Sequence, residues 1–99
     1  MNVELRPAAR ADIQSAIRYL KARAPRSTTH FRDAFMHALE TIEDNPHIGA
    51  PLPFLNPLLS GMRRFLVEYD YFIFYLPFRD RIEIIRVLHA RRDLNDIFT

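Results

Sequence analysis

The stretch RRFLVEYDYFIFYLPFRDRIEIIRVLHARRD, residues 63–93, carries the strongest structural signal in the sequence. Apolar, β-branched and aromatic residues fill positions 62–68, 71–76 and 81–88, and the polar segments EYD and PFRD separate these runs. Such runs joined by short turn-forming segments are typical of β-hairpins. We therefore expect three consecutive antiparallel strands, with paired arginines where the stretch begins and where it ends.

The middle strand has apolar residues on both of its faces. Side chains alternate along a strand, so Phe72 and Phe74 share one face, and Tyr71, Ile73 and Tyr75 share the other. Both faces should therefore be covered. A pair of helices can cover one face. The C-terminal segment, the preceding loop or another chain must cover the other.

The N-terminal half predicts one strand and two helices. NVEL, residues 2–5, is a short strand candidate, and Pro7 suits the first turn of a helix because its missing N–H would be unpaired there. Pro25 ends this helix, and Ser27 or Thr28 is a candidate N-cap for a second helix, which ends before Pro46. Two helices joined by so few residues form an antiparallel hairpin. The apolar stripe of the first helix consists of Ile13, Ala16, Ile17 and Leu20.

Two further segments complete the predicted fold. Residues 46–61, PHIGAPLPFLNPLLSG, contain four prolines and both glycines of the chain, and we expect an ordered crossover loop that packs over an edge of the core. RRDLNDIF, residues 91–98, predicts a short helix or tail that docks on the sheet. The expected fold class is α+β, with the order β-α-α-β-β-β in a single domain over residues 1–99. The apolar residues expected to pack are Ile48, Leu52, Phe54, Leu55, Leu58 and Leu59 in the loop and Leu94, Ile97 and Phe98 in the tail.

Composition excludes several classes of function. The chain of 99 residues has no cysteine, which removes disulfides, thiolate zinc sites and a cysteine nucleophile. Residues 1–10 hold no apolar run typical of a signal peptide, and no apolar stretch approaches the roughly 18 residues of a membrane span. We expect a cytoplasmic protein without a membrane partner. The formal net charge of +2 is mildly basic, and basic residues of the C-terminal half collect at Arg63, Arg64, Arg79, Arg81, Arg86, Arg91 and Arg92.

The usual catalytic arrangements are missing from the sequence. His30 and His37 lie two helical turns apart, roughly 10 Å, which is too far for shared metal coordination, so we expect no metal and no cofactor. Four carboxylates, Glu68, Asp70, Asp80 and Glu83, lie in or near the hairpin turns, where carboxylates are normally solvated.

The arginines and His89 leave two interpretations open. RNA cleavage without metal needs a general acid or base and cations at the transition state, which His89, Arg64, Arg91 and Arg92 could supply. A basic groove beside aromatic rings could also hold single-stranded nucleic acid by stacking. In the alternative interpretation the aromatic residues belong to the core and His89 is a hydrogen-bonding residue at the end of a strand.

Three segments, taken in this order, resemble a known family. They are NPHIGAP (45–51), MRRFLVEYDYFIFY (62–75) and IEIIRVLHARRDL (82–94). Together with the predicted order of strands and helices, these segments resemble the RelE/ParE superfamily of bacterial toxins. The resemblance is greatest to the ParE-like plasmid stabilisation proteins. The resemblance implies a toxin neutralised by a cognate antitoxin, ParD-like or similar, which would also link the toxin to operator DNA. ParE-like members block DNA gyrase, whereas RelE-like members cut mRNA on the ribosome.

Individual positions favour the ParE-like branch. RelE-like nucleases tend to carry lysines in the strand after the crossover, but the only lysine here is Lys21. Phe72 stands where an arginine is expected, and Phe98, the terminal aromatic residue, has no hydroxyl for proton transfer. We therefore expect no catalytic residues and a toxin that inhibits gyrase by binding. Two alternatives remain, a ribosome-dependent mRNA endonuclease and a decayed toxin that retains only antitoxin binding. The candidate target-binding residues are Arg63, Arg64, Tyr69, Tyr75, His89, Arg91 and Arg92.

Overall fold

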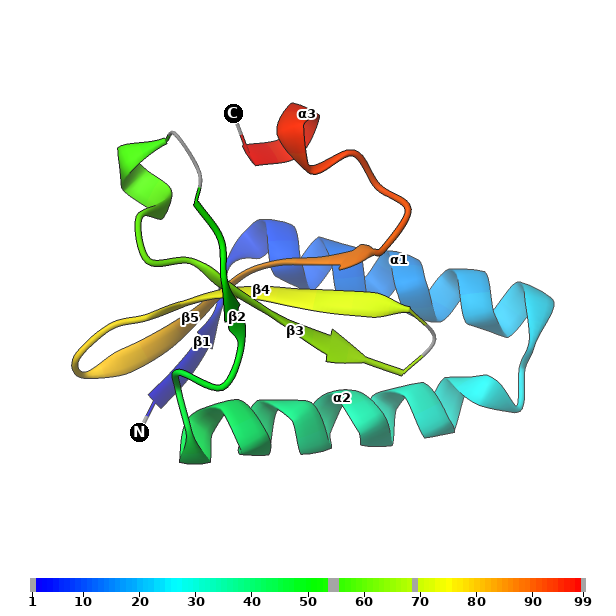
Figure 1. The fold of residues 1–99 in the computed structure, drawn as a ribbon. Coiled ribbons are helices and arrows are strands. Elements are labelled where there is room, and N and C mark those ends of the chain that lie inside the picture. Colours follow the sequence, from blue (N-terminus) through cyan, green and yellow to red (C-terminus); the bar gives the residue numbers. More distant parts are fainter. Residues whose placement is uncertain (1, 54–55, 69, 99) are drawn as a thin grey trace.

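The computed structural model describes residues 2–53, 56–68 and 70–98, and all statements below concern these residues. A five-stranded sheet in the order β1-β5-β4-β3-β2 forms the centre of this part of the chain. In Figure 1, α2 lies below the sheet, whereas α3 and the short 3-10 helix η1 lie above it. The elements are β1 (Asn2–Leu5), α1 (Pro7–Arg23), α2 (Ser27–Asp44), β2 (Ala50–Pro51), η1 (Pro57–Leu59), β3 (Arg63–Val67), β4 (Tyr71–Pro77), β5 (Arg81–His89) and α3 (Leu94–Phe98).

This architecture confirms the predicted α+β fold. Strands β3, β4 and β5 are joined as antiparallel neighbours, and β1 adds to β5 in parallel. The sheet is therefore mostly antiparallel, with the N-terminal strand at one edge. The two-residue strand β2, which pairs with β3 at the other edge, and the turn η1 were not predicted, because neither has a hydrophobic repeat long enough to recognise.

Two apolar layers explain why both faces of β4 are apolar. On the helix side, Phe35 and Ile42 of α2 pack with Ile73 and Tyr75. On the other side, Phe74 and Leu76 pack with residues of the crossover loop and the tail, including Leu59 and Phe98. The C-terminal segment and the crossover loop thus cover the second face together. These are two of the three covers that we predicted from the sequence.

Some local predictions were wrong. Neither Ser27 nor Thr28 is the N-cap of α2; that position is Arg26, which makes no side-chain capping bond. The backbone N–H groups of Ser27 and Thr28 instead donate to the carbonyls of Ala24 and Pro25, so the preceding turn replaces the cap. In the crossover loop, Ile48 and Leu58 are exposed, 42% and 83%, and do not join the core. Phe54 and Leu55 lie outside the described residues.

The length and apolar character of each helix decide whether it can span a membrane. Among the described residues, none of the helices has the length and the apolar character that crossing a bilayer requires.

Candidate functional site

Arg63 and Tyr75 are neighbours in the sheet and together hold the segment that follows α2. The Tyr75 hydroxyl donates to the Pro46 carbonyl at 2.8 Å and accepts from the Gly49 N–H at 2.9 Å. Arg63 Nη1 donates to the carbonyls of His47 at 3.0 Å and Gly49 at 2.7 Å. We call this group (Pro46, His47, Gly49, Arg63 and Tyr75) the loop clamp.

The loop clamp requires a glycine at position 49. A Cβ placed there would lie 2.7 Å from both the Arg64 carbonyl oxygen and the Tyr75 hydroxyl. Tyr75 is 0% exposed, and this burial raises the pKa of its hydroxyl, which keeps it a neutral hydrogen-bond donor. Contrary to the sequence interpretation, Tyr75 is not available as an aromatic anchor for a target, and the hydrogen bonds of Arg63 serve the fold.

The other predicted residue of β3, Arg64, lies on the opposite face of the sheet. Its guanidinium carbon is 4.8 Å from the centre of the Phe72 ring, and Phe72 packs on the layer that the tail covers. Tyr69, the second aromatic candidate, lies outside the described residues.

His89, Arg91 and Arg92 gather with two tyrosines at the free edge of β5. The rings of His89 and Tyr71 meet edge to face with their centres 5.3 Å apart. A pocket of about 280 Å³ opens beside them toward α1, and an adjoining hollow of about 290 Å³ includes Arg91. We define the edge pocket by the residues Asp12, Ser15, Tyr19, Tyr71, His89, Arg91 and Arg92.

Asp12 of α1 builds this pocket by fixing the helix to the strand. Strand β1 pairs with β5 only as far as Ile84, so the following residues of β5 form an edge. Asp12 Oδ2 accepts from the Val87 N–H at 2.9 Å and from Arg86 Nε at 2.7 Å, and Oδ1 accepts from Arg86 Nη2 at 2.9 Å. The same hydrogen bonds raise the pKa of the Arg86 guanidinium. Among the described residues that line the pocket, Asp12 is the one carboxylate, and it is therefore already neutralised.

The remaining groups of the edge pocket are more open. Tyr19 is 53% exposed, and the guanidinium carbon of Arg23 lies 5.0 Å from its ring centre. Tyr71 is half-buried. Its burial, and to a smaller extent the nearby Tyr19, raise the pKa of its hydroxyl. Within residues 2–53, 56–68 and 70–98, neither Arg91 nor Arg92 has an ion pair. The sequence interpretation missed Tyr19, although it is an aromatic residue outside the apolar stripe of its helix.

The arrangement separates one of the groups that were considered for RNA cleavage, Arg64, from the other three. His89 packs against Tyr71, which faces the helices, whereas Arg64 packs against Phe72 on the other face. The sheet lies between them, so the two cannot act on one phosphate. The described residues also include no group of three or more metal-ligating side chains that could hold an ion.

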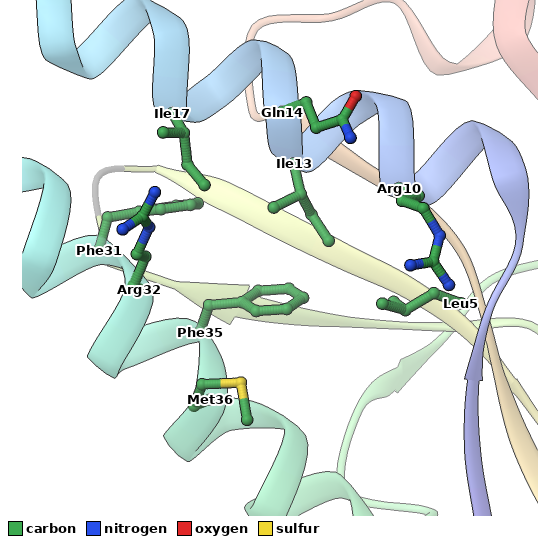
Figure 2. Close-up of a pocket in the computed structure, with 9 residues that line it drawn as sticks. All are labelled: Leu5, Arg10, Ile13, Gln14, Ile17, Phe31, Arg32, Phe35 and Met36. Carbon is green, nitrogen blue, oxygen red and sulfur yellow. The ribbon is translucent and has the colours of Figure 1, made fainter.

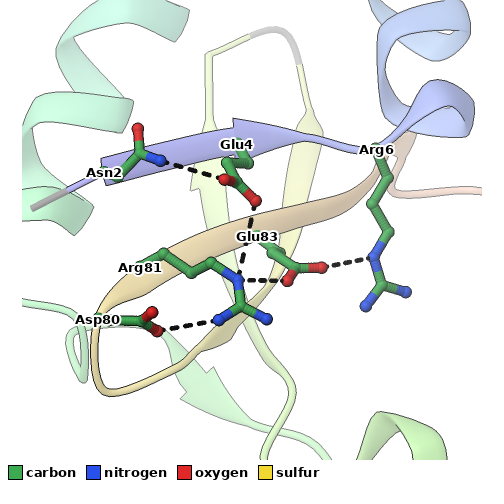
Figure 3. A network of polar contacts seen from close by, with 6 residues as sticks. All are labelled: Asn2, Glu4, Arg6, Asp80, Arg81 and Glu83. Atoms are coloured by element: carbon green, nitrogen blue, oxygen red, sulfur yellow. Dashed lines mark hydrogen bonds and ion pairs between the residues drawn. The ribbon is translucent and has the colours of Figure 1, made fainter.

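Two of the four carboxylate candidates, Asp80 and Glu83, are engaged in ion pairs with Arg81, as Figure 3 shows. Glu83 Oε1 accepts from Arg6 Nε at 2.9 Å, and Oε2 accepts from Arg81 Nε at 2.7 Å. Arg81 also pairs with Asp80 at 2.9 Å. Hydrogen bonds from Arg81 and then Arg6 lower the pKa of Glu83. Glu83, whose side chain is 14% exposed, is thus a paired anion and not the solvated turn residue that we expected.

A second concave surface lies between the two long helices (Figure 2). This groove of about 330 Å³ is mainly apolar, with Ile13 and Ile17 of α1 pointing toward Phe35 of α2. Arg10 and Arg32 lie near opposite ends of the apolar row. We name it the interhelix groove, lined by Leu5, Arg10, Ile13, Gln14, Ile17, Phe31, Arg32, Phe35 and Met36.

Comparisons with known proteins agree with this architecture. A family model described as the ParE toxin of the type II toxin-antitoxin system parDE matches residues 3–94. Among solved structures, the chromosomal ParDE system from P. aeruginosa has a chain with a TM-score of 0.73 and 16% identity, covering 92% of this chain and 97% of that chain. The YoeB dimer from Staphylococcus aureus matches with a TM-score of 0.57 and 18% identity, covering 87% of this chain and 92% of that chain. A YoeB–YefM complex from the same organism matches with a TM-score of 0.56 and 18% identity, covering 90% of this chain and 95% of that chain. A search of curated protein sequences gave no significant match.

Proposed function

The chain belongs to the ParE toxin family of type II toxin–antitoxin systems, and from this premise we propose that it acts by binding DNA gyrase in the bacterial cytoplasm. The edge pocket is the observation that supports a binding mechanism most strongly. Its exposed arginines, Arg91 and Arg92, lie beside Tyr19 on a framework that Asp12 and Arg86 hold in place. Arginine and tyrosine are enriched among residues that dominate the energy of protein interfaces.

A binding mechanism also agrees with the state of the polar groups. Metal-free RNA cleavage requires a proton donor or acceptor and cations around the same phosphate. Here the sheet separates Arg64 from His89, which leaves only Arg91 and Arg92 as cations beside it among the described residues, and the terminal aromatic Phe98 is buried and lacks a hydroxyl. The proposed target surface therefore consists of His89, Arg91 and Arg92, with Tyr19 in place of the buried Tyr75; Arg64 offers a separate contact on the other face.

The interhelix groove supports a second partner, a ParD-like antitoxin. An amphipathic helix can lay its apolar side into such a groove. Because Arg10 and Arg32 lie near its two ends, the helix should also carry acidic residues at both ends of its apolar stripe. Through this antitoxin the toxin would associate indirectly with operator DNA.

A matched pair of substitutions tests the antitoxin site. Met36, in the groove, is 56% exposed, so Met36→Asp should fold normally while placing a charge against the antitoxin's apolar stripe. We expect titration calorimetry to show at least a tenfold loss of antitoxin affinity. Leu58→Asp, at an 83% exposed residue outside the groove, should change the affinity less than twofold. Equal affinities for the two variants would remove the groove from antitoxin binding.

Two assays on the purified wild-type protein test the proposed target. We expect inhibition of DNA supercoiling by gyrase, and intact mRNA in a ribosomal translation reaction. Cleavage of mRNA at codon positions without any effect on supercoiling would establish the endonuclease alternative. Normal growth on induced expression, with antitoxin binding retained, would identify a decayed toxin.

A further inference from the structure

The edge pocket combines features that a purely protein-binding surface does not require. Two tyrosine rings and one imidazole line both of the adjoining hollows, with Arg92 on the lining of the first and Arg91 on the lining of the second. Within the described part of the chain, the hydroxyls of Tyr19 and Tyr71 make no hydrogen bond. His89 Nδ1 accepts from the Arg91 backbone N–H at 3.2 Å, whereas the two tyrosine hydroxyls are polar groups without a partner among the described residues.

The charge of the edge pocket selects for an anion. Asp12 is the carboxylate on its lining, and both oxygens of Asp12 already accept hydrogen bonds from Arg86 and Val87. Arg91 and Arg92 have no such partner among residues 2–53, 56–68 and 70–98. A guanidinium offers two parallel N–H donors, a geometry that fits the oxygens of a phosphate group.

The rings select for a flat, aromatic group beside that anion. Tyr19 keeps more than half of its surface exposed, although Arg23 lies over its ring. A base can stack on the open part of such a ring, and the nearby cation strengthens the contact. A carboxylate peptide would satisfy the arginines but would leave Tyr19 without a stacking partner.

We propose that the edge pocket binds single-stranded nucleic acid, with a phosphate held by Arg91 and Arg92 and an adjacent base stacked on Tyr19. A pocket of about 280 Å³ accommodates one unpaired base, whereas a duplex keeps its bases stacked inside the helix and presents only their edges. This inference goes beyond the inhibition of gyrase, because it concerns direct contact with a strand. A gyrase contact at the same surface remains compatible, since gyrase itself holds DNA.

Direct binding measurements without gyrase test the proposal. The fluorescence anisotropy of a labelled eight-nucleotide single strand, in DNA and RNA forms, is followed as the wild-type protein is added at low salt. We expect saturable binding to a single strand, and at least tenfold weaker binding to a duplex of the same length. No binding to either single strand, or tighter binding to the duplex, would overturn the proposal.

Three single variants locate the contact. Tyr19→Ala should weaken binding between roughly fivefold and a hundredfold, the range expected for the loss of one stacked base. Arg92→Ala should weaken it at least fivefold. Arg79→Ala, which removes an equal charge from the β4–β5 turn at the far end of β5, should change binding less than twofold. If Arg79→Ala weakened binding as much as Arg92→Ala, the attraction would be unspecific and the pocket assignment would be wrong.

The outcome is independent of the proposed gyrase function. All three variants replace exposed residues and are checked by thermal melting, so that a loss of binding is not confused with a loss of fold. A protein that inhibits supercoiling but does not bind the oligonucleotides would refute the nucleic-acid site alone. A protein that binds them without inhibiting supercoiling would refute the gyrase target alone.

Discussion

The loop clamp and the edge pocket are built from the same residue types, and they differ in what those residues face. In the loop clamp, the hydroxyl of Tyr75 and the guanidinium of Arg63 bond to main-chain groups of the segment after α2. In the edge pocket, Tyr19, Arg91 and Arg92 are exposed and point to no such partner in the described residues. An arginine next to a tyrosine therefore indicates a binding surface only where the fold leaves their polar atoms unused.

A substitution at the tightest point of the loop clamp should destabilise the protein most. Gly49→Ala would place a methyl group 2.7 Å from a backbone carbonyl oxygen and from the Tyr75 hydroxyl, so the β2 segment must move. We expect a loss of about 3 kcal/mol in the free energy of unfolding. Calorimetry should show the melting temperature falling by roughly 12–24 °C.

Gly61→Ala is the control for that prediction. A Cβ at Gly61 meets nothing within 4 Å, although its φ of +85° makes any side chain unfavourable. We expect Gly61→Ala to lower the free energy of unfolding by about 1 kcal/mol. A loss for Gly49→Ala no greater than for Gly61→Ala would show that the clamp is not tightly packed.

A matched comparison of arginines sharpens the contrast between the two regions. Arg63→Ala leaves the carbonyls of His47 and Gly49 without their donor, and we expect it to lower the free energy of unfolding by about 1–3 kcal/mol. The double substitution Arg91→Ala with Arg92→Ala should change it by less than about 0.5 kcal/mol, because both side chains are exposed. Urea unfolding measures both values. A double variant as unstable as Arg63→Ala would contradict the division into a structural and a functional region.

A smaller, pH-dependent effect should come from Glu83, which is internally paired like the loop clamp. Its folded pKa is lowered by Arg81 and Arg6, so its contribution to stability is complete above the unfolded pKa and is lost as the pH falls through the folded pKa. At pH 7, Glu83→Gln should therefore reduce stability by about 1 kcal/mol. Chemical unfolding at a series of pH values should show the two proteins converging in acid. A difference that stays constant from pH 7 down to pH 2 would argue against an ionic role for Glu83.

Much of the fold could be predicted from the sequence because its signals are local. The alternation through Tyr71–Pro77 and the helical spacing from Ile13 to Leu20 are each contained within one element. The N-terminal strand and the docking of Phe98 also followed from short apolar patterns. The cap of α2 was missed because a turn, and not a side chain, satisfies its first N–H groups.

The candidate site was less predictable because it depends on contacts between distant residues. His89, Arg91 and Arg92 were selected from their position at the end of a strand, and the structure brings them together. The role of Tyr75 as a buried clamp depends on Pro46 and Gly49, 29 and 26 residues away, which no local pattern reveals. Tyr19 joins the pocket only because Asp12 fixes α1 against the edge of β5.

The most direct test of a toxin that acts by binding through the edge pocket is inhibition of gyrase supercoiling by the Arg91→Ala, Arg92→Ala double variant. Its melting temperature should match that of the wild type, so that only the surface differs. We predict that the concentration for half-inhibition rises at least tenfold, equivalent to about 1.4 kcal/mol of lost binding free energy. Half-inhibition at the wild-type concentration would show that Arg91 and Arg92 do not contribute to gyrase binding.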